Sequence, residues 1–305
     1  MGADIVLRHK SLEMGIDSRL GGACTYLNYS RAHGLPFLDV LRQLPADSQV
    51  AFESACFAML PFSNRLMDSR LRMAAGTDLK LPPNSERVAV PVHGVGWMNA
   101  WEVTAKESNQ VTLAYRHAAN AHWPFPMVCT QTIGVFDGCV RFEASVCNTG
   151  QSSMPAGLGF HPRFALTPDA VVTLGVQSVW LQDSLGCPTH SVDVTDHDSF
   201  DFSVPRSAQS VALNHCFAGW SGQATLDFPG HQLSVCLSAS PELRHLVVYR
   251  LPGQAWLCIE PVSHAIGALS LDALASKLHG GRVLQPGECL SGSIEISLND
   301  YSVTQ

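Results

Sequence analysis

Charged residues are scarce in this sequence, and the basic ones are not clustered. Only 15% of the 305 residues are Asp, Glu, Lys or Arg, and the formal net charge is −7. A protein that binds nucleic acid normally gathers Lys and Arg on one face to neutralise phosphates, whereas these 19 basic residues are scattered along the chain. The sequence therefore argues against a nucleic-acid partner.

Export signals, membrane spans and metal-binding cysteine pairs are also missing. The opening MGADIVLRHKSLEMG contains no apolar signal segment, and Val6 stands where a myristoylation signal has Ser or Thr. No apolar run approaches membrane-spanning length. The ten cysteines form no CxxC pair, and Cys129, Cys236 and Cys258 lie in apolar runs, where a reduced thiol packs as a small apolar side chain. We expect reduced cysteines, no disulfide framework, no membrane partner and a cytoplasmic location.

Short runs with the two-residue period of β-strands are abundant. Residues 131–146 alternate on both sides of Asp137-Gly138, and residues 223–238 do so around Pro229-Gly230, so both segments predict hairpins. Further strands are expected at 111–115, 171–175, 246–250, 256–259 and 291–298.

Helical periodicity is limited to one segment, residues 271–281, where apolar positions at helical spacing end at two glycines. With 46% hydrophobic residues, the chain is long enough for a substantial core. These patterns predict one all-β domain over residues 1–305, built from two large antiparallel sheets packed face to face, with few short helices.

Two clusters in the first third of the chain carry side chains suited to ligand binding. The first is Ser63-Asn64-Arg65, in which the arginine offers a rigid fork of donors for hydroxyls or carboxylates. The second runs from His93 through Gly94 to Trp97, whose indole face could cover a sugar ring. The alternatives are a solvated surface loop for the first cluster and a turn with core tryptophans for the second.

Two later clusters carry candidate acid and base groups. Pro162 restricts His161 to extended geometry and so fixes the direction of its side chain. The apolar run AWLCI ends at Glu260, and a carboxylate there must either pair with a buried cation or line a pocket. For His161 the alternative is a core histidine bonded to a backbone carbonyl.

Taken together and in order, these clusters resemble the aldose 1-epimerase (galactose mutarotase) family. The resemblance rests on SNR at 63–65, HG with a following Trp at 93–97, FHP at 160–162 and IEP at 259–261. It covers most of the chain. The family's fold is a large antiparallel β-sandwich, the galactose mutarotase-like supersandwich, which agrees with the strand pattern.

The resemblance implies a role for each matched residue. Glu260 corresponds to the general base that takes the proton from the anomeric hydroxyl, and His161 corresponds to the general acid that protonates the ring oxygen. His93, Arg65 and the adjacent Asn64 match residues that hold sugar hydroxyls. The implied activity is the interconversion of α and β anomers of an aldose, with a monosaccharide as the partner; both a monomer and a homodimer remain open.

Two positions depart from the family pattern and bear on sugar specificity. Asn214 stands where many members have an Asp that bonds sugar hydroxyls. Arg163 follows the HP pair, where an aromatic residue is often adjacent. We expect Arg163 at or near the pocket rim, on the same face as His161 if the strand continues, and favouring a substrate with added polarity or negative charge.

The implied chemistry requires only proton transfers, so we expect no metal and no organic cofactor. Glutamate and histidine have ordinary pKa values of about 4.3 and 6.5, and modest tuning would leave a carboxylate and an imidazolium at neutral pH.

Three alternative functions are each supported by part of the sequence or by the fold. A hexose-6-phosphate 1-epimerase needs a phosphate cradle, for which arginines at 65, 70, 72 and 163 are available. A non-catalytic sugar-binding protein on the same fold has no need for Glu260 and His161 together. A polysaccharide-cleaving enzyme normally needs two catalytic carboxylates, and only Glu260 lies in a motif.

Overall fold

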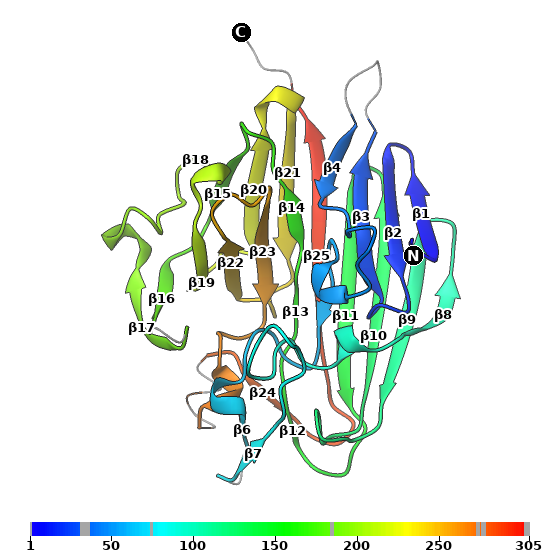
Figure 1. The fold of residues 1–305 in the computed structure, drawn as a ribbon, viewed down its shortest axis with the longest axis vertical. Helices are drawn as coiled ribbons and strands as arrows, with labels where there is room; N and C mark the ends of the chain where they lie inside the picture. Colours follow the sequence, from blue (N-terminus) through cyan, green and yellow to red (C-terminus); the bar gives the residue numbers. More distant parts are fainter. Residues whose placement is uncertain are drawn as a thin grey trace.

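The computed structural model of the chain describes residues 2–30, 37–73, 76–183, 186–272, 275 and 279–301. Regular structure in these residues is predominantly β-strand, arranged in two large antiparallel sheets and two short two-stranded ones (Figure 1). The prediction of an all-β sandwich is confirmed.

The larger sheet has twelve strands in the order β1-β2-β3-β4-β14-β23-β22-β19-β16-β17, with β13 pairing to β23 and β5 pairing to β13. Their bounds are β1 Ile5–His9, β2 Leu12–Asp17, β3 Ala23–Tyr29, β4 Leu38–Leu41, β5 Ala58–Met59, β13 Gly159–Phe160, β14 Arg163–Ala165, β16 Ser178–Gln182, β17 Pro188–Asp193, β19 Leu213–Ala218, β22 His245–Arg250 and β23 Trp256–Val262.

The second sheet has nine strands in the order β18-β15-β20-β21-β25-β11-β10-β9-β8. Their bounds are β8 Glu102–Lys106, β9 Gln110–His117, β10 Met127–Phe136, β11 Cys139–Asn148, β15 Val171–Leu174, β18 Arg206–Ser207, β20 Gln223–Phe228, β21 Leu233–Ala239 and β25 Cys289–Asp300. The short pairs are β12 Met154–Ala156 with β24 Arg282–Leu284, and β6 Arg70–Arg72 with β7 Asp78–Lys80.

Short 3₁₀ turns lie between several of the strands. They are η1 Ala51–Glu53, η2 Met67–Ser69, η3 Gly96–Met98, η4 Val194–Asp196, η5 Ala208–Ser210, η6 Pro229–His231 and η7 Ala268–Ser270. The helix predicted at 271–281 falls largely on 273–274 and 276–278, which lie outside the described residues.

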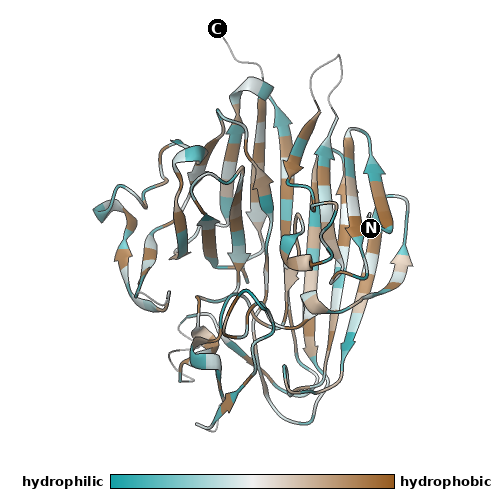
Figure 2. Cartoon of the chain, viewed as in Figure 1, coloured by the Kyte–Doolittle hydropathy of each residue, from teal (hydrophilic) through white to brown (hydrophobic). Residues whose placement is uncertain are grey.

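The main core lies between the two large sheets. One buried apolar cluster combines residues of the first sheet, such as Leu246 and Ile259, with residues of the second, such as Ile133 and Ile294. On β25, buried and more exposed positions alternate along the strand, as the two-residue period requires. Figure 2 shows this alternation of hydropathy along several strands. Burial of this shared face is what holds the sandwich together.

The central strands of the twelve-stranded sheet are covered on both faces. On β22 and β23 nearly every residue is buried. Leu246 and Val248 face the main core, whereas Val247 belongs to a second cluster that includes Phe57 and Trp97 from the loops over the opposite face. This second face, roofed by loops instead of by another sheet, is where polar side chains can be enclosed.

Both predicted hairpins are confirmed. Strands β10 and β11 turn at Asp137-Gly138, and β20 and β21 turn through η6, which contains Pro229-Gly230. At the first turn Gly138 has φ +68°, a left-handed value that glycine adopts readily. The strands predicted at 111–115, 171–175, 246–250, 256–259 and 291–298 correspond to β9, β15, β22, β23 and β25.

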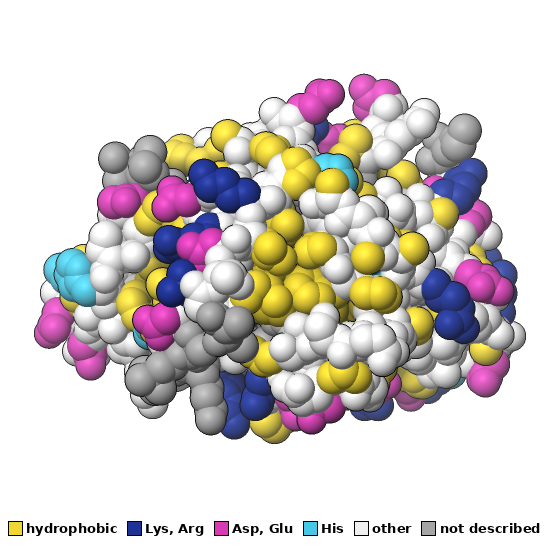
Figure 3. All heavy atoms as spheres, turned by 90° about the horizontal axis from the view of Figure 1, so that it is seen from below, with side chains coloured by type: hydrophobic (Ala, Val, Ile, Leu, Met, Phe, Trp, Pro, Cys, Tyr) yellow, Lys and Arg dark blue, Asp and Glu magenta, His cyan; other side chains and the backbone are white. Residues whose placement is uncertain are grey.

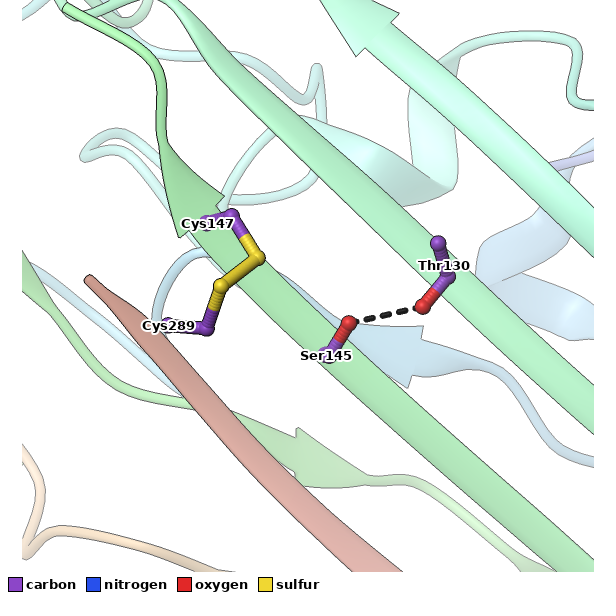
Figure 4. Close-up of a disulfide and its surroundings, with 4 residues drawn as sticks. All are labelled: Thr130, Ser145, Cys147 and Cys289. Carbon is purple, nitrogen blue, oxygen red and sulfur yellow. Dashed lines mark hydrogen bonds between the residues drawn. A yellow bond between two sulfur atoms is a disulfide. The ribbon is translucent and has the colours of Figure 1, made fainter. Parts of the chain in front are cut away.

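One expectation about the cysteines is wrong. Cys147 on β11 and Cys289 on β25 are directly opposed in the strand register and form a disulfide (Figure 4). Their sequence separation is 142 residues, so only the pairing of these two strands brings them together. Cys129 and Cys258 are free and buried, as predicted, while Cys236 is free and half-buried.

The end of the molecule that carries the two short strand pairs has a mixed surface. Figure 3 shows hydrophobic side chains gathered near its centre, with acidic and basic side chains dispersed around them. Among the described residues, no helix has both the length and the apolar character needed to cross a membrane.

Candidate active site

A cavity of about 320 Å³ opens on the loop-covered face of the twelve-stranded sheet. It lies over β19, β22 and β23 and is walled by η1 and by the segments around residues 64, 87 and 93. The lining residues are Phe52, Asn64, Arg65, Arg87, Val88, Val92, His93, His161, Arg163, Asn214, Val247, Tyr249 and Glu260. Seven of the eight site residues predicted from the sequence therefore meet in one place.

Glu260 and His161 are in direct contact in this cavity. The His161 Nε2 atom lies 3.1 Å from Glu260 Oε1, and both side chains are almost completely buried. Glu260 is paired across the sheet with Val247, which also lines the cavity, so strand alternation points both away from the main core. Glu260 thus lies within β23 on the face toward the cavity, while the opposite face of the strand is part of the apolar core.

Aromatic rings surround the His161 imidazole, and a hydrogen bond holds its main chain. Its ring stacks on Phe57 with centroids 4.9 Å apart and planes inclined by 18°, and it meets His93 edge-on at 5.3 Å. The His161 backbone N–H donates to the Phe57 carbonyl at 3.0 Å. Phe52 approaches the same ring at 6.4 Å, so the imidazole is held in a largely aromatic wall.

Burial shifts the pKa values of this pair in opposite directions. Desolvation raises the pKa of Glu260 to about 8, partly offset by the charge of Arg163. Desolvation also lowers the pKa of His161 well below its usual value, and the charge of Arg163 lowers it further. Burial therefore favours the neutral form of each group, in contrast to the expected carboxylate and imidazolium.

His93 is held in one orientation and one tautomer by its neighbour Asn64. The Asn64 backbone N–H donates to His93 Nδ1 at 3.0 Å, and the His93 backbone N–H donates to the Asn64 carbonyl at 2.9 Å. Burial lowers the pKa of His93 to about 3, so the imidazole is neutral. Since Nδ1 accepts a hydrogen bond, the proton resides on Nε2, which becomes a donor.

The backbone around these two residues is strained in a way that is typical of functional sites. Asn64 and His93 have φ values of +54° and +57°, which are uncommon for residues other than glycine. Next to His93, a Cβ atom on Gly94 would lie 2.0 Å from the Leu60 carbonyl oxygen. The close approach that this glycine permits is therefore to another backbone segment.

Arg163 is a buried part of the wall and not a residue of the rim. It is 4% exposed, and its two terminal nitrogens donate to the carbonyls of Ser54 and Phe52 at 2.7 and 2.6 Å. Its guanidinium also lies over the rings of Phe57 and Trp256, each 5.7 Å from the ring centroid. Arg163 shares the cavity with His161, as expected, but it is anchored to the segment that contains η1.

Trp97 does not line the cavity, contrary to the prediction from the sequence. Its indole N–H donates to the carbonyls of Val92 and Gly94, and its ring packs edge-on against Phe52 at 5.6 Å. The tryptophan therefore supports Phe52 from behind, and the alternative of a turn with a core tryptophan is the one that the structure realises.

Asn214 lies on β19 and lines the cavity with Tyr249 and Val247 of the adjacent strand β22. Its backbone carbonyl accepts a hydrogen bond from Gln182 at 2.9 Å. Tyr249 was missed in the sequence, although the alternation within 246–250 would have placed it on the same face as residue 247.

Phe52 and Arg87 were also missed, because neither belongs to a recognisable motif. Arg87 forms an ion pair with Glu53, the residue next to Phe52. Phe52 lines the cavity from η1, and Arg87 lines it from a separate segment that this ion pair ties to η1. Nothing in the sequence near residue 52 or 87 indicates this.

One group of side chains in the site has the donor atoms of a metal ligand set. Ligand atoms of His161, Cys258 and Glu260 all lie within 4.8 Å of one another, and all three residues are buried. Cys258 is two residues before Glu260 on β23 and so shares its face of the sheet. The expectation that the reaction itself needs no metal stays a prediction.

Comparisons with known proteins agree on one family and fold. The family model described as aldose 1-epimerase matches residues 6–297. The uncharacterized protein YphB of Escherichia coli (strain K12) is 27% identical over 225 residues, which cover 72% of this chain and 76% of that protein.

Solved structures extend this similarity at the level of the fold. A structure from Escherichia coli K12, provisionally described as an aldose 1-epimerase, has a TM-score of 0.86 at 23% identity and covers 99% of each chain. A galactose mutarotase-like protein from Clostridium acetobutylicum has a TM-score of 0.82 at 18% identity, with 97% of this chain and 95% of that chain covered.

Proposed function

The chain belongs to the aldose 1-epimerase family, and we propose that it interconverts the α and β anomers of a free aldose. The observation that carries this proposal is the contact between Glu260 and His161, an enclosed carboxyl and imidazole 3.1 Å apart. They lie in a cavity of about 320 Å³, which is within the size range of small-molecule sites. A sugar-binding module has no need for such a pair.

The reaction opens the sugar ring, rotates about the C1–C2 bond and closes the ring on the other face of C1. Opening requires that a proton leave O1 while another reaches O5, and closing reverses both transfers. O1 and O5 are bonded to the same carbon, so a base and an acid in contact with each other can serve these adjacent oxygens. In this proposal Glu260 acts on O1 and His161 acts on O5.

The protonation states that burial favours fit this sequence of transfers. A neutral carboxyl with a neutral imidazole contains the same number of protons as a carboxylate with an imidazolium. Transfer of one proton from Glu260 to His161 therefore produces the base and the acid together, with no exchange of protons with solvent. Arg163 favours the carboxylate, as its effect on the pKa of Glu260 indicates.

The remaining polar residues of the wall are suited to hold sugar hydroxyls. The His93 Nε2–H is available as a donor because its Nδ1 accepts from Asn64. Arg65 and the Asn214 amide line the same cavity and offer further donors. We assign Asn64 a role in orienting His93, in addition to any contact with the sugar.

A second candidate function is epimerisation of an anionic sugar such as a hexose 6-phosphate. The observation in its favour is that Arg65, Arg87 and Arg163 line the cavity together, whereas Asn214 supplies no negative charge. Several guanidinium groups near one cavity favour a phosphate, carboxylate or sulfonate on the substrate. Arg87 is engaged with Glu53 and Arg163 with backbone carbonyls, which weakens this candidate.

Polarimetry on freshly dissolved pure anomers tests the proposal directly. We expect neutral or anionic aldoses, compared in one panel, to reach anomeric equilibrium faster with the protein than without it. Glu260→Gln and His161→Asn should each lower kcat by roughly 10²–10⁴-fold with little change in KM. The losses in the double variant should be less than multiplicative because the pair shares one proton relay.

A matched control is Glu143→Gln, which makes the same chemical change on the exposed face of β11. It should retain the wild-type rate. A protein that binds sugars but leaves the anomeric rate unchanged would instead be a non-catalytic binder. Near-normal catalysis by Glu260→Gln would overturn the assignment of the base.

A further inference from the structure

Cys258 places a thiol beside the two groups to which we assign acid–base roles. It lies on β23, two residues from Glu260 and therefore on the same face of the sheet. Its sulfur, a His161 ring nitrogen and a Glu260 carboxylate oxygen are mutually within 4.8 Å, and all three side chains are buried. The proposed sugar chemistry makes no use of this thiol.

Sulfur, imidazole nitrogen and carboxylate oxygen are the three donor types that Zn²⁺ prefers in proteins. Sites with three protein ligands leave a fourth position for water or another small ligand. Mg²⁺ and Ca²⁺ take oxygen ligands instead, so this set selects against them. We propose that His161, Cys258 and Glu260 form an inhibitory binding site for Zn²⁺ or the chemically similar Cd²⁺, in which the cation occupies the acid–base pair.

The surroundings of the three donors are compatible with a bound dication. A thiolate and a carboxylate together neutralise its two charges. Arg163 faces Cys258 across the β14–β23 pairing, and its charge favours the thiolate of Cys258 and the carboxylate of Glu260, the forms that bind a cation. The same charge opposes a dication, but the guanidinium is held by the carbonyls of Ser54 and Phe52 and does not itself occupy the ligand atoms. The Phe57 ring, stacked on His161, and the adjacent strands hold the ligand atoms in place, which reduces the reorganisation needed for binding.

A cation can reach this site through the sugar cavity. His161 and Glu260 line that cavity, whereas Cys258 is buried behind them. A bound cation would occupy the Nε2 and carboxylate atoms that must exchange protons with O1 and O5. Its inhibitory effect, though not its binding, rests on the proposed epimerase function.

Binding is measured on the full-length protein without sugar, by calorimetric titration with Zn²⁺ and by ultraviolet thiolate-to-metal absorption with Cd²⁺. We expect one site per chain that depends on Cys258. Cys258→Ser should lower the affinity of that site for Zn²⁺ by at least about 10–100-fold, because even the loss of a residue that only supports a metal ligand has an effect of this size. The same variant should lack the Cd²⁺ absorption band.

Cys129→Ser is the matched control, since Cys129 is an equally buried free thiol located on β10 of the other sheet. It should bind both cations as the wild type does. Equal Zn²⁺ affinity in the wild type and in both Cys258→Ser and Cys258→Ala would overturn the proposal, because the metal would then be bound elsewhere, for example by surface histidines. Absence of binding by the folded wild type would also overturn it.

Polarimetry supplies the second readout, with each protein's rate normalised to its own rate in chelator. At a Zn²⁺ concentration about ten times the dissociation constant, the wild type and Cys129→Ser should lose about tenfold in rate, since the unoccupied fraction is then about one in eleven. Cys258→Ser should be unaffected at that concentration, and Mg²⁺ should inhibit none of them. Specific metal binding without any epimerase activity would refute the proposed function alone, whereas activity without metal binding would refute this inference alone.

Discussion

Replacing Glu260 by glutamine should abolish most activity and yet stabilise the folded protein above neutral pH. In the folded state burial raises the pKa of this carboxyl to about 8, whereas the unfolded chain has its ordinary value of 4.5. The folded state therefore retains a proton that the unfolded state has lost. Between these two values, rising pH favours unfolding of the wild type.

The size of the effect follows from the two pKa values. A shift of one pKa unit corresponds to about 1.36 kcal/mol. The rise of the Glu260 pKa from 4.5 to about 8 therefore lowers the free energy of unfolding of the wild type at pH 8 by at most on the order of 5 kcal/mol. Because His161 can accept the proton across the 3.1 Å contact, we expect a smaller gain for Glu260→Gln, on the order of 2–3 kcal/mol at pH 8. The gain should be small near pH 4.5, where the folded carboxyl holds its proton and the unfolded one is about half protonated, and should vanish below that pH.

The assay is denaturant unfolding of the wild type and Glu260→Gln at several pH values from 4.5 to 8.5, with midpoints and slopes compared. Glu143→Gln, on the exposed face of β11, should differ from the wild type by less than about 0.5 kcal/mol throughout. A difference between Glu260→Gln and the wild type that stays constant with pH, or a variant less stable than the wild type at pH 8, would refute the reasoning.

Three further predictions concern the same cavity. If the reaction uses the one shared proton of the Glu260–His161 pair, kcat/KM should be level at neutral pH and fall above about pH 8, where Glu260 of the free protein loses its proton; a rate that instead rises from pH 6 to 8 would contradict this. Trp97→Phe removes the donor to the Val92 and Gly94 carbonyls and should lower the free energy of unfolding by about 1 kcal/mol with KM little changed; a tenfold increase in KM would return Trp97 to the sugar site. Arg163→Met leaves two buried carbonyls without their donor and should cost about 2–4 kcal/mol in denaturant unfolding. The same variant should also lower the rate on anionic sugars relative to neutral ones, and unchanged relative rates would remove Arg163 from substrate selection.

The strand content, the two hairpins and most of the cavity residues could be predicted from the sequence. A two-residue period reports directly which side of a strand is apolar, and the turns at Asp137-Gly138 and Pro229-Gly230 are local. Glu260 was conspicuous because a carboxylate rarely ends an apolar run without a reason. The motif order then associated it with His161, Asn64, Arg65 and His93 through resemblance to a family.

Other features depend on contacts between segments that are distant in the chain. The Cys147–Cys289 disulfide forms because β11 pairs with β25. The two cysteines are 142 residues apart, so no local sequence pattern predicts that they are partners. Arg163 is a wall residue because Ser54 and Phe52 present their carbonyls to it.

The sequence by itself therefore determined where the strands and hairpin turns form and which polar side chains are candidates for the site, since periodicity, turn chemistry and motif order can be read along the chain. Only the tertiary structure decided that Trp97 supports the wall instead of lining it, that Arg87 and Tyr249 join the cavity, and that Glu260 favours its protonated form. The physical reason is that exposure and desolvation are set by what the rest of the chain places around a side chain. In water, Glu260 and His161 would have their ordinary pKa values. Here the fold removes water from both side chains, which raises the pKa of Glu260 and lowers that of His161.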